Sequence, residues 1–178
     1  MNISGNTGSM ERVKKSYKNL LALGEGANGA DFRMTFDEPG YDDLEFLVQS
    51  TQFAAMAREM IESKGPHGVM FNQQGNYKNA VDVPITFKSV VSGKERVFLR
   101  DWVRNKRYIT CHLAQISESA PESTSENTVT YEDCWIEIDG MDLSVDDGAV
   151  LVKPSGTLHV NWASHADDPV DQQTLSWE

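Results

Sequence analysis

The most constraining feature of this sequence is a two-residue alternation of apolar and polar side chains that begins after residue 30. Phe32, Met34 and Phe36 are separated by single charged or polar residues. Successive side chains of a strand point to opposite faces, so this period predicts strands with one buried face. The same pattern predicts further strands at residues 44–49, 83–87, 108–116, 129–138, 157–162 and 172–177. The expected fold class is therefore mainly β.

Two segments interrupt the alternation with helical spacing. Residues 93–104 place Phe98 and Trp102, and likewise Leu99 and Val103, four positions apart, so we predict a helix there. Residues 53–64 also have apolar side chains on one helical face and contain several Ala, Met and Glu residues. Local propensity alone therefore favours a second helix over this stretch.

The organisation of the chain predicts an N-terminal arm, residues 1–30, followed by a single β domain, residues 31–178. Five glycines between Gly5 and Gly29 favour flexibility in the arm, whereas residues 10–23 have mild helical character. A segment rich in Ser, Glu and Thr, residues 117–128, predicts a long hairpin loop between two strands.

Charge and hydropathy limit the partners of the chain. With 27 acidic and 16 basic residues, its net charge is -11, which disfavours binding to nucleic acid or to an anionic membrane. The sequence has neither the apolar core of a signal peptide nor a stretch of about 18 apolar residues that could cross a membrane. We therefore expect a protein that folds in the cytoplasm, contacts no membrane, and keeps Cys111 and Cys134 reduced.

None of the short motifs predicts an enzyme or a cofactor site. Residues 24–29 fit GxGxxG, but a helical stretch precedes them and a strand follows, the reverse of a phosphate-binding turn. The four histidines show no metal-ligand spacing, and the acidic turns lack the ligand pattern of a calcium loop. We therefore predict no catalytic residues, no bound cofactor and no metal.

A distinctive order of short motifs runs through residues 31–178. A Val-Pro-Ile-Thr-Phe strand precedes a helix that carries Asp-Trp at residues 101–102. A Trp-Ile-Glu-Ile-Asp-Gly segment (135–140) and a Leu-x-x-x-Trp segment (158–162) follow, and the chain closes on Trp-Glu at residues 177–178. This order resembles the tail tube protein family of contractile-tailed bacteriophages.

The resemblance implies both a fold and a function. The fold is two packed, roughly orthogonal antiparallel sheets, sandwich- or barrel-like, with one helix near residues 93–104 and an extended N-terminal arm. The function is a structural subunit of the virion tail, forming stacked hexameric rings around a channel through which DNA passes without specific binding. The implied partners are other copies of the chain and the sheath, tape measure, baseplate and tail terminator proteins.

The resemblance also changes the prediction for residues 53–71 from a helix to a long β-hairpin that turns at residues 64–68. In a strand, Glu59 and Glu62 point to opposite faces, so either one is a candidate to face the channel. The residues expected between subunits are Ala57, Arg58, Met60, Ile61, Val69 and Phe71.

Two alternatives to a tail tube subunit stay open on the sequence. One is a tube-initiating baseplate ring, or a secreted hexameric tube protein, of the same fold. The other is a small β-rich hydrolase or ligand-binding protein, for which no sequence motif is present.

Overall fold

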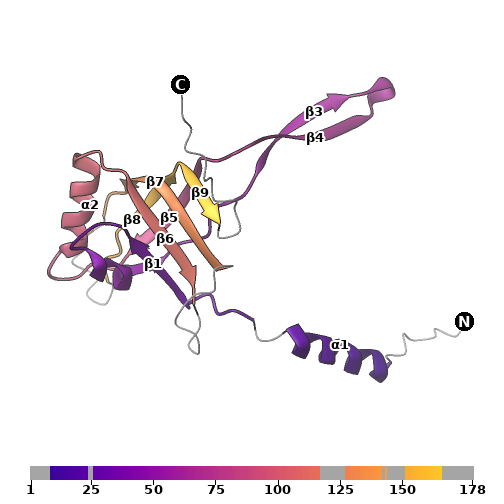
Figure 1. Ribbon diagram of the computed structural model, residues 1–178, viewed down its shortest axis with the longest axis horizontal. Coiled ribbons are helices and arrows are strands. Elements are labelled where there is room, and N and C mark those ends of the chain that lie inside the picture. The colour runs from indigo at the N-terminus through magenta and orange to yellow at the C-terminus, as the bar shows by residue number, and fades with distance from the viewer. Residues whose placement is uncertain (1–8, 24–25, 117–126, 142, 144–150, 166–178) are drawn as a thin grey trace, which may run out of the picture. The chain divides into compact units, whose positions relative to one another are not determined.

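The computed structural model describes residues 9–23, 26–116, 127–141, 143 and 151–165 (Figure 1). The chain divides into two compact units, Met1–Asp31 and Phe32–Glu178. The strand predicted at residues 172–177, and all but the last two residues of the loop predicted at 117–128, lie outside the described residues.

The first unit contains one described helix, α1 (Met10–Leu23), which confirms the helical character predicted for this segment. Ser9 precedes it, and its side-chain oxygen lies 3.4 Å from the backbone nitrogen of Arg12, the position of an N-cap contact. Further on, the Asn28 side chain accepts a hydrogen bond from the Ala30 backbone. Neither α1 nor any other described helix is long and apolar enough to cross a membrane.

The second unit is built on a seven-stranded antiparallel sheet that is nearly closed into a barrel. The strand order is β1-β6-β7-β8-β5-β2, with β9 also paired to β7. This confirms the prediction of a mainly β, barrel-like fold. The strands are β1 (Phe32–Phe36), β2 (Val48–Ser50), β5 (Val81–Phe87), β6 (Ile109–Gln115), β7 (Thr128–Ile138), β8 (Ser155–Val160) and β9 (Trp162–His165).

Strand β7 joins the two halves of the sheet. Its first half pairs with β6 and β9, and its second half pairs with β8. The register against β6 shifts near Asp133, whose positive φ of 51° marks a bulge. The Asn161 side chain, at the break between β8 and β9, donates a 2.8 Å hydrogen bond to the Asp133 carbonyl. The bulge lets one strand serve both halves of the curled sheet.

The core lies inside the sheet and under α2 (Lys94–Arg104), the helix predicted at residues 93–104. Phe98, Leu99 and Trp102 are the apolar side chains that α2 buries. The Phe36 ring from β1 lies 5.6 Å from that of Phe98 and 6.0 Å from that of Trp102, in edge-to-face contacts typical of aromatic cores. Apart from Leu44 and Ala54, the other buried apolar side chains of this core lie on the strands, at alternate positions except across the β7 bulge, as the period-two pattern predicts.

The strand predicted at residues 44–49 is largely wrong. Residues Asp42–Leu47 form a 3-10 helix, η1, and only β2 at the end of this stretch is a strand. A 3-10 helix has about three residues per turn. Leu44 and Leu47 therefore share its inner face, whereas Phe46 is 75% exposed. The apparent alternation came from residues that follow a three-residue period.

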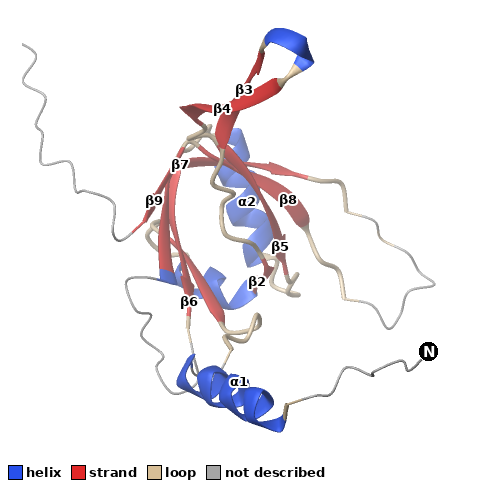
Figure 2. Cartoon of the chain, turned by 90° about the vertical axis from the view of Figure 1, so that its right-hand side faces the viewer, coloured by secondary structure: helices blue, strands red, loops and turns tan. Residues whose placement is uncertain are grey.

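A second, two-stranded sheet consists of β3 (Arg58–Lys64) and β4 (Met70–Tyr77), joined by a turn that contains the 3-10 segment η2 (Pro66–Gly68). The helix that local propensity favours at residues 53–64 is therefore wrong, and the hairpin implied by the resemblance is present. Its first strand begins at Arg58 rather than at residue 53. Figure 2 shows the hairpin extending away from the main sheet.

Candidate self-assembly surface

The β3–β4 hairpin has a defined register that assigns each side chain to a face. Ile61 pairs with Gln73 and Glu62 with Asn72, and side chains of directly paired residues share a face. The register shifts by one residue opposite Glu59, which indicates a bulge on β4.

The two faces of the hairpin differ in charge. The first, here called the Glu59 face, has a single charged side chain and no basic one. The second, here called the Glu62 face, combines one acidic and two basic side chains. The Glu59 face comprises Glu59, Ile61, Ser63, Phe71 and Gln73, and the Glu62 face comprises Arg58, Met60, Glu62, Lys64, Met70, Asn72, Gln74 and Tyr77.

Both faces of the hairpin are open to solvent. Every residue of β3 is exposed, as is every residue of β4 except the half-buried Gly75. Large apolar side chains are among them: Met60 is 63% exposed, Ile61 51% and Phe71 60%. Several large apolar side chains exposed on one projecting element are typical of interaction sites.

The base of the hairpin is held firmly by the main sheet on its N-terminal side. The Tyr131 hydroxyl of β7 accepts a 3.0 Å hydrogen bond from the Ala54 backbone and lies 3.2 Å from the Gln52 carbonyl, to which it donates. Tyr131 itself is fully buried in the core. Burial raises the pKa of Tyr131 to about 12, so the hydroxyl keeps its proton and its role as donor throughout the neutral range.

The C-terminal side of the hairpin base has its own contacts. The Asn79 side chain donates a 3.0 Å hydrogen bond to the Asn161 carbonyl, at the break between β8 and β9. The Tyr77 ring lies 6.2 Å from the Trp162 ring in an edge contact. Between the two sides, Lys78 donates a backbone hydrogen bond to the Ala57 carbonyl. The exposed hairpin therefore projects from an anchored base.

The main sheet also has open edges among the described residues. Strand β1 pairs only with β6, and β2 pairs only with β5, within the part of the chain that the structure describes. Unpaired strand edges present free N–H and C=O groups and are a template for pairing with another chain.

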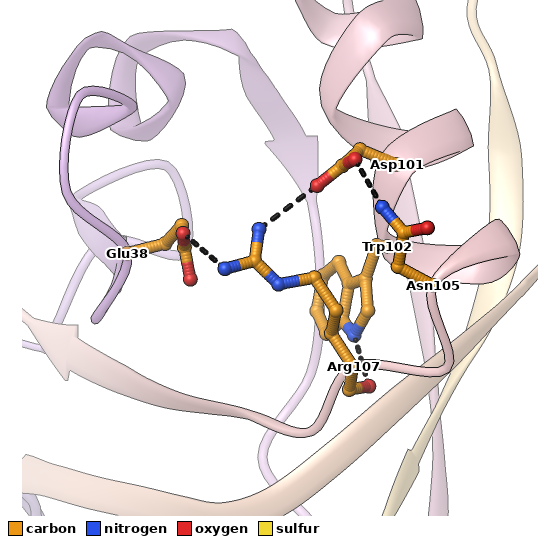
Figure 3. Close-up of polar contacts among 5 residues, drawn as sticks. All are labelled: Glu38, Asp101, Trp102, Asn105 and Arg107. Carbon is orange, nitrogen blue, oxygen red and sulfur yellow. Dashed lines mark hydrogen bonds and ion pairs between the residues drawn. The ribbon is translucent and has the colours of Figure 1, made fainter.

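The Asp-Trp step on α2 takes part in a set of structural contacts (Figure 3). Arg107 bridges two carboxylates, at 2.8 Å to Asp101 and 2.6 Å to Glu38, and the hydrogen bond to Asp101 is the main contribution that raises its pKa. The Trp102 indole donates to the Arg107 carbonyl at 3.1 Å. These contacts tie the end of α2 to the turn that follows β1.

The two cysteines are both fully buried and both free. Burial, together with the neighbouring Cys134 thiol, raises the pKa of Cys111 well above its usual value. A buried thiol with a raised pKa is unreactive. Among the described residues, no group of three or more His, Cys, Asp or Glu side chains could hold a metal ion.

The structure brings the predicted hairpin residues together on one projecting element. Arg58, Met60 and Ile61 lie on β3 and Phe71 on β4, whereas Ala57 and Val69 immediately precede the two strands. The sequence pattern indicated neither the C-terminal part of β4, up to Tyr77, nor the anchor Tyr131. Tyr131 carries no sequence signal that separates it from an ordinary core residue of β7.

No protein-family model matches the sequence, and no curated protein matches it either. Solved structures do match the fold. A chain of the PVC sheath–tube complex, from an extracellular contractile injection system in its extended state, is 12% identical with a TM-score of 0.61, over 89% of this chain and 97% of that one.

Two further structures agree with this likeness. A chain of the anti-feeding prophage tube-terminating cap is 10% identical with a TM-score of 0.63, over 92% of this chain and 97% of that one. The SPP1 tail tube is 13% identical with a TM-score of 0.52, over 79% of this chain and 80% of that one. The chain therefore has the fold of tail tube and tube-cap proteins.

Proposed function

We propose that this chain is a non-enzymatic structural subunit of a phage tail tube, one that assembles into stacked hexameric rings around a channel for DNA. The observation that carries the proposal is the β3–β4 hairpin, which is anchored at its base and exposed on both faces within a tail-tube-like fold. Hairpins from neighbouring subunits that pair edge to edge form a continuous inner barrel and leave no free edges.

The same assembly implies further partners and a location. The fold neighbours come from a sheath–tube complex, a sheath/tube terminator and a baseplate. We infer that this chain contacts sheath, tape measure, baseplate and terminator proteins, and that it resides in the virion tail after assembly in the host cytoplasm.

A second candidate function is a tube-terminating or tube-initiating ring. The likeness to a tube-terminating cap, with a TM-score of 0.63, favours it. Electron microscopy of the purified chain at rising concentration separates the candidates. Long tubes support the tail tube subunit, and isolated rings support the terminal ring. A chain that stays monomeric at all concentrations contradicts both.

The charge of the channel lining is the consequence of the proposed function that can be tested most directly. A cationic lining would hold DNA phosphates through counterion release, whereas carboxylates keep the DNA mobile. Charge favours the Glu59 face as the lining, because that face carries no basic side chain, whereas the Glu62 face carries Arg58 and Lys64. Large apolar side chains do not separate the faces, because Ile61 and Phe71 lie on one and Met60 and Met70 on the other.

The substitutions Glu59→Lys and Glu62→Lys decide between the faces, and each is the matched control for the other. Both glutamates lie on β3 and both are exposed, so the two variants change the charge equally without touching the core. We expect both to assemble, and only the channel-facing variant to slow DNA ejection from otherwise normal particles. The slowing should weaken as salt rises, because charge interactions are screened over about 10 Å at roughly 0.1 M salt. Wild-type ejection rates for both variants at low salt would contradict a role for either glutamate.

A further inference from the structure

Helix α1 has an apolar face that nothing else in the described part of its own unit covers. Met10, Val13, Tyr17, Leu20 and Leu21 recur at spacings of three and four, which places them along one side of the helix. None of the 14 residues of α1 is buried. Val13 is 57% exposed, Tyr17 60% and Leu20 64%.

A helix of this length is a poor candidate to persist alone. Isolated helices shorter than about 12–15 residues are marginal in water, and most helices in proteins are stabilised by packing of an apolar face. The Ser9 contact at its start is one local stabilising feature, and its last turn has no basic residue to offset the helix dipole. The apolar stripe therefore indicates a surface that packs against a partner.

The charge of α1 indicates the chemistry of that partner. The helix carries four basic residues, Arg12, Lys14, Lys15 and Lys18, and one acidic residue, Glu11. The chain after Asp31 has the opposite balance, with 24 of the 27 acidic residues and 12 of the 16 basic ones. A basic helix in an otherwise acidic protein is complementary to the surface of another copy of that protein.

We propose that α1 docks through its apolar face onto the Phe32–Glu178 unit of a second copy of this chain, with its basic side chains facing acidic surface there. The proposal rests on the proposed function, and it deepens it by naming the arm as the connection between subunits. Residues 24–31 separate α1 from β1, and eight residues extend to at most about 29 Å.

An anionic lipid surface is the competing partner for a basic amphipathic helix. The charge of the rest of the chain disfavours it, because the acidic unit tethered to α1 would be repelled by the same lipids. A second copy offers apolar and acidic surface together, without that repulsion.

The experiment compares two doubly substituted full-length chains. Tyr17→Asp/Leu20→Asp places two carboxylates in the apolar stripe, and Ser16→Asp/Asn19→Asp places the same two charges one position earlier, outside the stripe. All four positions are exposed, so neither variant disturbs a core. Thermal unfolding of both variants should match the wild type and so exclude a folding defect in the main unit.

Self-association is measured by sedimentation velocity over a concentration series at low and high salt, with electron microscopy of the products. We expect the stripe variant, Tyr17→Asp/Leu20→Asp, to self-associate only at a protein concentration at least tenfold higher than the wild type. The control variant, Ser16→Asp/Asn19→Asp, should self-associate like the wild type. High salt should weaken wild-type association. Equal association of the stripe variant and the control overturns the proposal, as does a wild type that stays monomeric.

Two outcomes separate this inference from the proposed function. Tubes formed equally well by wild type and stripe variant leave the tube subunit intact and remove the role of α1. Association that depends on the stripe but gives no tubes or rings supports α1 docking and contradicts the tube. A parallel flotation assay uses phosphatidylserine–phosphatidylcholine vesicles. If the wild type binds these vesicles, the stripe variant does not, and self-association is the same for both, the inference is overturned in favour of a lipid surface.

Discussion

The β3–β4 hairpin and the β5–β8 pair are both antiparallel, yet they differ in the burial of their apolar side chains. Strand β8 alternates half-buried and buried positions, and β5 buries Val83, Ile85 and Phe87. Strands β3 and β4 bury no residue, although they carry Met60, Ile61 and Phe71. The first pair is stabilised by the core of its own subunit. The second pair has no core within the described chain, so its apolar side chains would be buried only in contact with another chain.

The first prediction tests the hairpin edge and has the largest expected effect. Successive backbone N–H groups of β3 point alternately toward β4 and toward the open edge. One of the substitutions Met60→Pro and Ile61→Pro therefore removes a hydrogen-bond donor within the hairpin, and the other removes a donor that could pair with a neighbouring subunit. Both should abolish tubes or rings in electron microscopy, while the main unit keeps its wild-type unfolding midpoint. Met60→Ala and Ile61→Ala, which keep the N–H, serve as controls. Tubes from both proline variants would show that the hairpin is not an assembly edge.

The second prediction contrasts a glycine in each region. A Cβ added at Gly156 on β8 would lie 2.3 Å from the Glu137 carbonyl oxygen, too close for any backbone to accept without moving. A Cβ at Gly75 on β4 would meet its nearest atoms, among them the Glu59 Cβ, at 3.2 Å. We expect Gly156→Ala to lower the free energy of unfolding by about 3 kcal/mol and Gly75→Ala by less than about 1 kcal/mol. Urea unfolding measures both, and equal losses would mean that the hairpin is as tightly constrained as the sheet.

The third prediction concerns Tyr131, where the main sheet contacts the segment that leads into the hairpin. Tyr131→Phe removes the hydroxyl that contacts Gln52 and Ala54, and should cost about 1–2 kcal/mol in the free energy of unfolding. The hairpin base should loosen, with faster hydrogen exchange at the Ala54 amide, while the core keeps its packing. Unchanged exchange at Ala54 would show that this hydroxyl does not anchor the hairpin.

The same residue predicts a dependence on alkaline pH. The folded-state pKa of Tyr131 is about 12, above the ordinary value of 10, because burial disfavours the phenolate. The contribution of the protonated Tyr131 hydroxyl to the stability of the fold is therefore fully present below pH 10 and is lost as the pH rises through 12. Between these pH values, the free energy of unfolding of the wild type should fall by up to about 2 kcal/mol, and that of the Tyr131→Phe variant should not. Parallel stability curves for the two proteins over this range would contradict the assignment.

Sequence patterns predicted the correct element where the spacing of apolar residues along the chain matches the side chains that the fold buries. The helix α2 was predicted because Phe98 and Trp102 lie four residues apart, and the same spacing packs both rings into the core. Strands β1, β5, β6, β7 and β8 were predicted because their alternate side chains meet that core. The period failed at Asp42–Leu47, where three closely spaced apolar residues fit a strand and a 3-10 helix equally well.

At the hairpin, local helix propensity and strand pairing favour different structures, and strand pairing determines the one observed. Ala57, Glu59 and Met60 favour a helix locally, but the register with β4 and the turn at Pro66–Gly68 hold this segment as a strand. The hairpin was predicted only because the order of motifs resembles a known family. Nothing local to residues 58–64 indicates a strand whose faces are both exposed.

The sequence by itself determined the mainly β class, the helix α2, the helical arm segment and the acidic balance, because each depends on periodicity or composition that acts over a few neighbouring residues. Only the tertiary structure decided that Tyr131 anchors the hairpin and that Arg107 joins Asp101 to Glu38. Tyr131 and Gln52 are 79 positions apart, and Arg107 and Glu38 are 69 apart. Contacts over such separations arise only when the sheet curls and brings its strands together, and no local pattern encodes them.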